Sequence, residues 1–510
     1  MRLLTPSQAY ELDKISIKSQ NISGVELMGN AGRCVAKKAI ELLKNIQNPS
    51  IFIICGKGNN GGDGFATAKI LHRYGYRVIL HSIIPEKNIK LDALKYHNDC
   101  KKLGIPNTYG IEIPIIKKPN LIIDGLLGIG FKGKLRKEII PWINWINNSN
   151  LLVLSIDIPS GLNGSSGSVL SECIKANTTV TFGAPKLGMV FRNGPNYTGQ
   201  IKIVDIGFLK INSIKLSGIK WKQYSEPDVN YFLKVPNLDL NKYSSGKVLI
   251  VAGSKTMTGA AILSTYGALR CGTGLTITTA PSSLNNIYER SIIEGMTLPL
   301  EDFGFGIMND SNFEDIMKKV EWADSVLVGP GMGRKRETKK LIKRLVKHVD
   351  KPLVLDADGL YPYNGKIDEL NKREHPLVIT PHIGELSKLI GVKKDLIILK
   401  FPDIMNHIYE NFNHISLIKQ IPNCIFKNEN AIINKTGNPG LATAGTGDVL
   451  AGIISGFIAQ GLDPFDAASL GSFIHGKASD ILIQEKGYRG QIASDLLDKI
   501  PEVISEYERS

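Results

Sequence analysis

The chain has 510 residues, 43% of them hydrophobic and 22% charged, which is ordinary for a globular protein. Because one hydrophobic core stops growing at about 250–300 residues, this length predicts two domains. The net charge of +14 would suit a protein that binds nucleic acid or a membrane surface. The lysines are scattered through amphipathic segments, however, without a basic stripe or a recognition motif. We therefore expect neither partner.

The cysteines and the N-terminus indicate a cellular compartment. Six cysteines stand far apart with no C-x-x-C pair, and the nine histidines form no H-E-x-x-H motif. This pattern suits a reducing compartment and argues against a structural zinc site. Acidic Glu11 and Asp13 interrupt the N-terminus before a signal-like apolar run develops, and no uncharged run reaches the ~18 residues of a membrane span. We expect a cytoplasmic protein.

Short β-branched runs alternate with helical patterns along the whole chain, which predicts parallel α/β sheets in both halves. Residues 1–215 form the first predicted domain and residues 241–510 the second. Residues 216–240, a stretch containing several lysines and prolines, are predicted to be a linker. The predicted strands are 51–55, 77–80, 120–123, 151–156, 178–181, 248–252, 275–278, 325–328, 352–355 and 377–380, with a hairpin over 415–434.

A glycine-rich loop, 56–64, follows the first predicted strand and precedes a helix predicted over 65–73. Gly56, Gly58 and Gly61 match G-x-G-x-x-G, but no acidic residue stands some 20 positions on, as a dinucleotide site requires. Unpaired backbone N–H groups at a helix N-terminus still favour an anion. The loop is therefore predicted to hold a phosphate, and the alternative is a tight strand-to-helix turn without a ligand.

Two more strands of this half end in an aspartate and a glycine-rich turn. Asp124 begins one such turn and Asp157 the other. Either residue alone would more often serve as a turn or cap residue. Because ligands of open α/β sheets bind beyond the carboxyl ends of the strands, two aspartates and the glycine loop at one edge predict a site.

Three segments together resemble the NAD(P)H-hydrate epimerase domain over about residues 1–215: G-N-N-G-G-D-G, D-G-L-L-G-I-G and D-I-P-S-G-L-N-G. The resemblance implies a Rossmann-like three-layer α/β/α fold. It also implies a K⁺ ion held by Asn60, Asp124 and Ser160, with Asp157 as the catalytic residue at the nicotinamide ring. The implied contacts to the substrate's phosphates are Asn59, Asn60, Gly61, Gly62, Asp63, Gly128, Ile129, Gly130, Phe131, Lys132, Gly133 and Lys134.

The second half has its most specific pattern at 438–448, Asn-Pro-Gly-Leu-Ala-Thr-Ala-Gly-Thr-Gly-Asp, before an apolar helix predicted over 449–460. Gly445, Thr446 and Gly447 would place free N–H groups at that helix N-terminus, where they can stabilise a phosphoryl group in transfer. Asp448 could then take a proton from an attacking hydroxyl. The alternative role of Asp448 is to offset the helix dipole.

Further motifs at predicted strand ends, 328–333, 355–360 and 380–385, favour a site over a simple helix cap. Together with 438–448 they resemble the ADP-dependent NAD(P)H-hydrate dehydratase branch of the ribokinase-like fold, over about residues 230–505. The resemblance implies that Ala260, Gly333, His382 and Asp448 contact the hydrate. The implied nucleotide contacts, with Mg²⁺ on the phosphates, are Gly445, Thr446, Gly447 and the loop Lys419, Gln420, Ile421, Pro422 and Asn423.

The nucleotide loop departs from the family pattern Lys-Gly-x-x-Thr, because Gln420 and Asn423 replace the glycine and the threonine. That change leaves the preference between ADP and ATP open. The fusion of both domains implies an enzyme that interconverts the R and S forms of NADHX and NADPHX and dehydrates the S form with ADP.

Two other interpretations of the sequence stay open. One is a ribokinase-like small-molecule kinase with an N-terminal binding module, since the Gly-Thr-Gly-Asp loop and the fold are shared with that class. The other is a non-catalytic binding module, against which the presence of both Asp124 and Asp157 argues. The sequence does not fix the oligomeric state, and a homo-oligomer is compatible with it.

Overall fold

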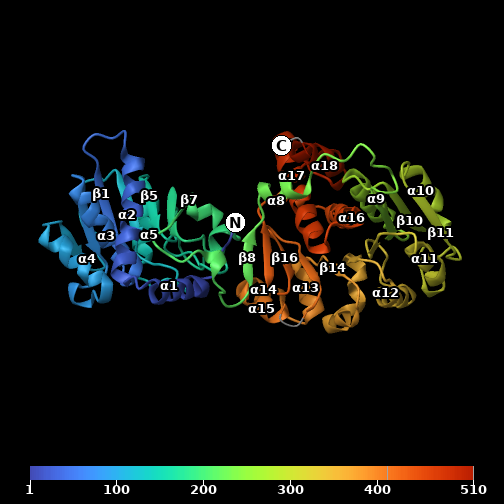
Figure 1. Cartoon of the computed structure of the whole chain (residues 1–510), viewed down its shortest axis with the longest axis horizontal. Helices are drawn as coiled ribbons and strands as arrows, with labels where there is room; N and C mark the ends of the chain where they lie inside the picture. The colour runs from blue at the N-terminus through green and yellow to red at the C-terminus, as the bar shows by residue number, and fades with distance from the viewer. Residues whose placement is uncertain (410–411, 509–510) are drawn as a thin grey trace. The chain divides into compact units, whose positions relative to one another are not determined.

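The computed structural model describes residues 1–409 and 412–508 (Figure 1). The chain divides into two compact units, one of residues 2–220 and one of Met1 with residues 221–510. No helix within the described ranges is long and apolar enough to cross a membrane.

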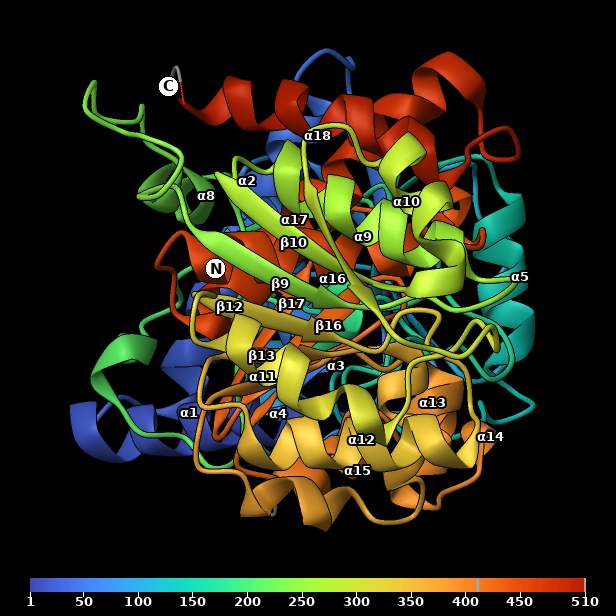
Figure 2. The same cartoon turned by 90° about the vertical axis from the view of Figure 1, so that its right-hand side faces the viewer.

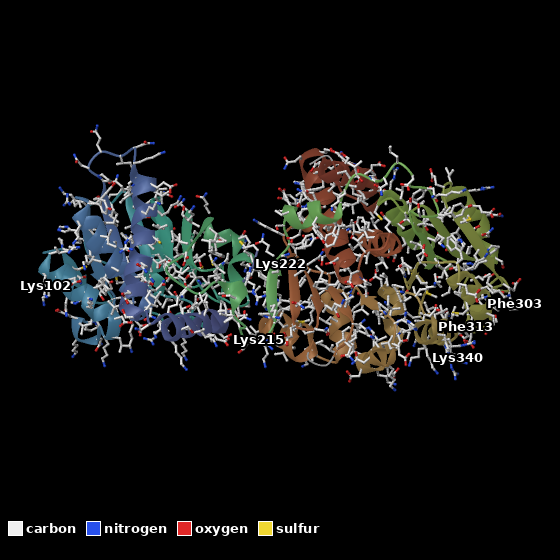
Figure 3. The ribbon with its side chains drawn as sticks, viewed as in Figure 1. Lys102, Lys215, Lys222, Phe303, Phe313 and Lys340 are labelled. Atoms are coloured by element: carbon white, nitrogen blue, oxygen red, sulfur yellow. The ribbon has the colours of Figure 1, made fainter. Side chains whose placement is uncertain are left out.

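The lysines labelled in Figure 3 belong to separate elements or loops. Lys102, for example, ends α4 (Leu91–Lys102), and Lys340 lies in α12 (Arg336–His348).

The first unit is built on a seven-stranded sheet of order β3-β2-β1-β4-β5-β6-β7, in which every neighbouring pair is parallel. Its strands are β1 (Ser50–Cys55), β2 (Arg77–Ser82), β3 (Asn107–Tyr109), β4 (Leu121–Gly125), β5 (Leu152–Ile156), β6 (Thr178–Phe182) and β7 (Gln200–Val204). The other helices are α1 (Pro6–Gln20), α2 (Gly24–Leu43), α3 (Asn59–Arg73), α5 (Ile140–Asn148), α6 (Leu187–Val190) and α7 (Pro195–Thr198).

Alternate residues of these buried strands pack against helices on opposite faces of the sheet. Ile51 and Ile53 of β1 share one core with α2, α3 and α4. Phe52 and Ile54 of the same strand share another core with Trp142 and its neighbours in α5. Because side chains alternate along a strand, one apolar run serves both layers. The unit is therefore the three-layer α/β/α structure that the sequence predicts.

The second unit contains a ten-stranded sheet of order β11-β10-β9-β12-β13-β14-β15-β16-β17-β8. The strands from β11 to β15 pair in parallel, and β15, β16 and β17 form an antiparallel meander. Its strands are β8 (Lys220–Gln223), β9 (Lys247–Val251), β10 (Leu275–Pro281), β11 (Met296–Leu300), β12 (Ser325–Val328), β13 (Leu353–Leu355), β14 (Leu377–Ile379), β15 (Ile415–Ile418), β16 (Asn423–Lys427) and β17 (Asn430–Asn434).

Helices cover both faces of this sheet, and Figure 2 shows α12 and α13 on the side opposite α9 and α18. The α9, α16, α17 and α18 side shares a single apolar core with β9, β12, β13 and β14. The remaining helices are α8 (Glu226–Phe232), α9 (Thr258–Arg270), α10 (Asn285–Ser291), α11 (Phe313–Val320), α13 (Ile383–Ile390), α14 (Lys394–Lys400), α15 (Asp403–Tyr409), α16 (Thr446–Ala459), α17 (Pro464–Lys486) and α18 (Ala493–Glu508). These architectures confirm the α/β fold class predicted for both halves.

The structure corrects three details of the sequence prediction. Residues 216–240 are not a simple linker, because β8 is the outer strand next to β17 and α8 follows it. The glycine loop is shorter than predicted, since α3 begins at Asn59 rather than at residue 65. The predicted hairpin over 415–434 is a three-stranded meander. The strand β8 has only four residues, and residues 59–64 are asparagine, glycine and aspartate, so no apolar period marks these two segments.

Candidate active sites

In the first unit, the carboxyl ends of β1, β4, β5 and β6 meet at one edge of the sheet, beside the place where the strand order reverses. In open α/β sheets this is where ligands bind. Hydrogen bonds join the loops at this edge. The Asn60 amide donates to the carbonyl oxygens of Leu127 and Ile156 at 2.8 and 2.9 Å. The structure therefore brings together the glycine loop and the turns after Asp124 and Asp157.

Two glycines of the loop are needed for close backbone contact. A Cβ at Gly56 would lie 1.8 Å from the carbonyl oxygen of Leu126, and one at Gly61 would lie 2.1 Å from that of Gly56. Gly58 faces open space. The first two positions thus keep the loop against its neighbour, which leaves the N-terminus of α3 open toward a ligand.

The residues predicted to hold K⁺ form one hydrogen-bonded group. Ser160 Oγ lies 2.6 Å from Asp124 Oδ1 and accepts from the Leu127 N–H at 2.8 Å. Asp124 is fully buried, and burial raises the pKa of its carboxyl group against the opposing effect of hydrogen bonds from Ser160 and Ser155. No ion pair to Asp124 occurs within residues 1–409 and 412–508. A bound monovalent cation would therefore stabilise this carboxylate.

Asp157 stands directly after β5 with φ +61°, a left-handed conformation that is unusual for a side chain other than Asn, Asp or Gly. Its Oδ1 accepts from Thr181 Oγ1 at 3.1 Å and from the Phe182 N–H at 3.2 Å. The same oxygen accepts from the ammonium group of buried Lys186. The backbone strain and the three donors hold one carboxyl oxygen in place.

A cavity of about 570 Å³ opens at this edge. The predicted residues that line it are Asn59, Asn60, Asp63, Gly128, Ile129, Gly130, Phe131 and Asp157. Asp124 and Ser160 lie behind the lining, and Gly62 instead packs against Met28 and Ala93. Gly61, Lys132, Gly133 and Lys134 are also outside the lining. The cavity is large enough for one end of a dinucleotide.

Asp63 is an unexpected phosphate contact, because an ionised carboxylate would repel a phosphate. Burial and the nearby charge of Asp157 raise the pKa of Asp63 well above its usual range. In the protonated form this carboxyl group can donate a hydrogen bond to a phosphate or hydroxyl oxygen. Tyr10 and Asp13 of α1, which the sequence interpretation does not include, also line the cavity.

In the second unit, Gly445 precedes α16 with φ +91°, and Thr446, Gly447 and Asp448 form the first turn of the helix. Burial raises the pKa of Asp448 to about 7, and the charges of Asp356, Asp358 and Glu385 add to this effect while Lys419 opposes it. A carboxyl group with such a pKa can accept a proton near neutral pH. This pKa is compatible with the general-base role that the sequence predicts for Asp448.

Lys419 and Asp356 form an ion pair beneath the Gly-Thr-Gly-Asp loop. Lys419 Nζ donates to Asp356 Oδ1 at 2.7 Å, and a Cβ at Gly447 would lie 3.1 Å from that nitrogen. Burial lowers the pKa of Lys419, but Asp356 and Glu385 outweigh it, so the pKa is raised. Lys419 therefore stays charged next to Gly447, as a phosphate contact requires.

The altered nucleotide loop has its own internal support. The Gln420 N–H donates to Asn423 Oδ1 at 3.0 Å, and Asn423 Nδ2 donates to Ser472 Oγ at 3.0 Å. The Ile421–Pro422 peptide bond is cis. Asn423 thus closes the turn with its side chain and ties it to α17, which fixes a loop that lacks the family's glycine and threonine.

His382 is the N-cap of α13, and its Nδ1 accepts from the Gly384 and Glu385 N–H groups at 2.9 and 3.3 Å. Its side chain is 58% exposed, and its Nε2 lies 3.5 Å from Glu385 Oε1. Gly333 donates its N–H to Asp358 Oδ2 at 2.9 Å. Ala260 lies in α9, beside Gly331. The histidine therefore has a structural role whatever it binds.

A second cavity, of about 450 Å³, lies beyond the ends of β14 and β15, beside the start of α16. The predicted residues that line it are His382, Lys419, Gln420, Ile421, Asn423, Thr446 and Gly447. Pro422, Gly445, Ala260, Gly333 and Asp448 are not part of its lining. The nucleotide residues are thus brought together, and Asp448 lies in the helical turn beside them. The charge of Asp358, which accepts a hydrogen bond from the Gly333 N–H, contributes to the raised pKa of Asp448.

Sequence reasoning does not single out Lys186, and it includes Asp356 only as part of the motif 355–360, without a role of its own. Lys186 stands four residues after β6 and Asp356 directly after β13, both at the edge where the sites lie. That position is the available signal, but the burial of each ion pair cannot be read from it.

Comparison with known proteins covers both units. A family model described as "YjeF-related protein N-terminus" matches residues 24–188, and one described as "NAD(P)H-hydrate dehydratase" matches residues 248–502. Two proteins named "Bifunctional NAD(P)H-hydrate repair enzyme Nnr" are similar over nearly their whole length. The one from Moorella thermoacetica is 33% identical over 100% of this chain and 97% of its own, and the one from Salinibacter ruber is 32% identical over 99% and 96%.

Among solved structures, the ADP/ATP-dependent NAD(P)H-hydrate dehydratase of Bacillus subtilis, co-crystallised with ATP/Mg²⁺, is 25% identical. The match covers 56% of this chain and 98% of that one, with a TM-score of 0.48. The family assignment depends on the full-length relatives, whose two halves align in the same order as the two units described above. This chain therefore belongs to the family of bifunctional NAD(P)H-hydrate repair enzymes.

Proposed function

We propose that the first unit interconverts the R and S forms of NAD(P)H hydrate and that the second dehydrates the S form to NAD(P)H with ADP as phosphoryl donor. The observation that carries this proposal is the presence of a separate cavity in each unit, with a buried or half-buried aspartate at the sheet edge beside it. Membership of the family supplies the substrate class.

In the first unit, Asp157 would exchange a proton with the hydroxyl group on carbon 6 of the hydrated ring. The hydroxyl leaves as water once it gains a proton, with the ring nitrogen supplying the electron pair, and water that returns to either face gives a proton back. One carboxyl group can carry this proton in both directions. The N-terminus of α3 and Asn59, Asn60 and Asp63 would bind the substrate's phosphates.

The Asn60, Asp124 and Ser160 group would hold K⁺. Its oxygen ligands are hard, as this ion prefers, and its fully buried carboxylate has no described cationic partner. When bound, the ion would supply positive charge close to the phosphate-binding loop. Gly128 suits this arrangement, because a Cβ there would lie only 3.3 Å from Asn60 Oδ1.

In the second unit, Asp448 would take the proton of the hydrate's hydroxyl group as its oxygen attacks the terminal phosphorus of ADP. The N–H groups of Gly445, Thr446 and Gly447 would stabilise the phosphoryl group during transfer. Phosphate is a far better leaving group than hydroxide, so its departure re-forms the ring double bond and yields NAD(P)H, AMP and phosphate.

A Mg²⁺ ion on the nucleotide's phosphates would offset their charge. The buried Oδ2 of Asp356 suits it, because this oxygen has no hydrogen-bond partner within the described ranges and lies near Gly447. Lys419, held by the other oxygen of Asp356, would meet the same phosphates.

Separate assays on the full chain test the two activities. Purified R hydrate, without nucleotide, should be converted to a mixture of R and S forms that chromatography resolves. Purified S hydrate with ADP and Mg²⁺ should release phosphate in step with NAD(P)H. A stable phosphorylated product would instead support the small-molecule kinase, and an inert R hydrate would support a non-catalytic first unit.

A further inference from the structure

Lys186 lies at the first site, and its side chain is only 2% exposed. Its ammonium group donates to Asp157 Oδ1, to Thr181 Oγ1 at 3.0 Å and to the Phe182 carbonyl oxygen at 3.4 Å. A fully buried ammonium group is costly unless each of its protons is bonded. All three protons have acceptors here, so the arrangement is complete without a ligand.

The backbone around Lys186 is fixed by the N-terminal segment. The Leu4 N–H donates to the Pro185 carbonyl oxygen at 3.0 Å, and the Leu187 N–H donates to the Leu4 carbonyl oxygen at 2.8 Å. These two bonds flank Lys186, and Leu4 is fully buried. The segment that leads into α1, whose Tyr10 and Asp13 line the cavity, therefore also fixes the lysine.

The bonds to Asp157 are asymmetric. Thr181 Oγ1, the Phe182 N–H and Lys186 all donate to Oδ1. For Oδ2, the structure of residues 1–409 and 412–508 gives no hydrogen-bond partner, although Asp157 lines the cavity. One oxygen is thus committed to the protein, and the other is left for a ligand.

From this geometry we propose that Lys186 is a positioning residue of the epimerase. Lys186 fixes Asp157 through Oδ1, so that Oδ2 alone exchanges a proton with the substrate, and it supplies the positive charge nearest to that carboxylate. This inference rests on the proposed epimerase function and adds a residue to it.

The other titratable groups around the cavity make this charge important. Asp63 of α3, Asp92 of α4, Tyr10 and Asp13 of α1, and Lys57 line the cavity with Asp157. Four of these groups are carboxyls, and the charge of Asp157 contributes to the raised pKa of Asp63 and of Tyr10. Without Lys186, Asp157 would lose the cation it is bonded to and would share the cavity with three other carboxyl groups. The loss of a bonded cation favours the protonated form of a carboxyl group.

The test compares Lys186→Met with Lys186→Arg in the full chain, using R hydrate without nucleotide. We expect Lys186→Met to lower kcat of epimerisation about 100-fold with KM changed by no more than about threefold, because the change acts on proton transfer. The acid limb of its pH–rate profile should move to higher pH. Lys186→Arg should retain more activity than Lys186→Met.

Two controls separate a positioning role from a folding role. Lys175→Met replaces an exposed lysine of the same unit and should leave epimerisation unchanged. Each variant should also dehydrate S hydrate at the wild-type rate, because that activity belongs to the other unit. Should Lys186→Met fail to fold, Thr181→Val removes one donor to Oδ1 and one acceptor of Lys186, and it should lower kcat about tenfold.

The proposal is overturned if a folded Lys186→Met keeps the wild-type kcat and pH profile, or if Thr181→Val does so where Lys186→Met does not fold. A loss of activity that arginine does not relieve, with an unshifted pH profile, also overturns it. If the wild-type protein itself does not interconvert R and S hydrate, the proposed epimerase function fails instead.

Discussion

A buried or partly buried lysine–aspartate ion pair lies at each of the two sites, but the two pairs differ in their relation to the aspartate that we propose as catalytic. In the first unit Lys186 bonds to Asp157 itself. In the second, Lys419 bonds to Asp356, and Asp448 is a separate group whose pKa is raised to about 7. Under the proposed roles, a lysine fixes the reacting carboxylate directly at the first site and leaves it free to bind a proton near neutral pH at the second.

This difference matches the two proposed reactions. Epimerisation needs a carboxyl group with a fixed orientation toward one ring carbon. Three hydrogen-bond donors to Asp157 Oδ1 fix the orientation of that carboxyl group. Phosphoryl transfer needs a base that holds a proton while the hydroxyl attacks, and a pKa near 7 suits that step. Lys419 is then available for the phosphates, next to Gly447.

The largest expected effect separates the two aspartates. Asp448→Asn should lower dehydration of S hydrate about 10²–10⁴-fold, because it removes the general base, and should leave epimerisation unchanged. Asp157→Asn should do the reverse. Both variants can be assayed for both activities in one preparation. Equal loss of both activities in either variant would contradict the assignment of one aspartate to each reaction.

A pH profile sharpens the comparison. The basic form of Asp448 is required, and its pKa of about 7 lies above the ordinary value, so this form is lost as the pH falls through about 7. We expect kcat/KM for dehydration to fall about tenfold per pH unit below that point. Epimerisation measured in the same buffers controls for general inactivation. A flat profile between about pH 6 and 8 would contradict a base with this pKa.

The glycine loop of the first site can be tested through stability. Gly56→Ala would place a Cβ 1.8 Å from the Leu126 carbonyl oxygen, whereas Gly58→Ala meets nothing within 4 Å. The first change should destabilise the unit by about 1–3 kcal/mol through the forced backbone shift, and the second should be close to neutral. Denaturant unfolding of each variant checks this. Equal unfolding free energies would mean that the loop is not closely packed.

The smallest effect concerns the altered nucleotide loop. Asn423→Ala removes the bond to the Gln420 N–H and the tie to Ser472. Loss of these hydrogen bonds should destabilise the ordered loop by about 1 kcal/mol. The KM for ADP should therefore rise about fivefold with kcat nearly unchanged. Asn430→Ala, at an exposed position of the same meander, is the matched control. An unchanged KM would show that Asn423 does not organise this loop.

Much of both folds can be predicted from the sequence, because buried parallel strands are continuous apolar runs and their ends share one edge. The same reasoning correctly predicts that Asp124 and Asp157 lie together. The edge strands β3, β7, β8 and β11 escape prediction, since they are short or half-exposed and lack such runs; β7, for example, has no fully buried residue. The polar stretch that contains β8 therefore resembles a linker in sequence.

The sites are less predictable than the fold. Residues at strand ends can be placed by topology, but Lys186 reaches Asp157 only because the chain after β6 is held by Leu4 from the other end of the unit. Likewise Lys419 bonds to Asp356, which directly follows β13 and is 63 residues away in sequence. Such contacts depend on tertiary packing, which no local pattern encodes.

The most direct test of the two-site account is the recovery of dihydronicotinamide absorbance in the near ultraviolet from mixed R and S hydrate. The full chain is supplied with ADP, Mg²⁺ and K⁺. Two working sites predict complete recovery, because the R form is converted to S as the S form is consumed. Recovery that stops near the initial S fraction would contradict the epimerase assignment, and no recovery with ADP or ATP would contradict the dehydratase assignment.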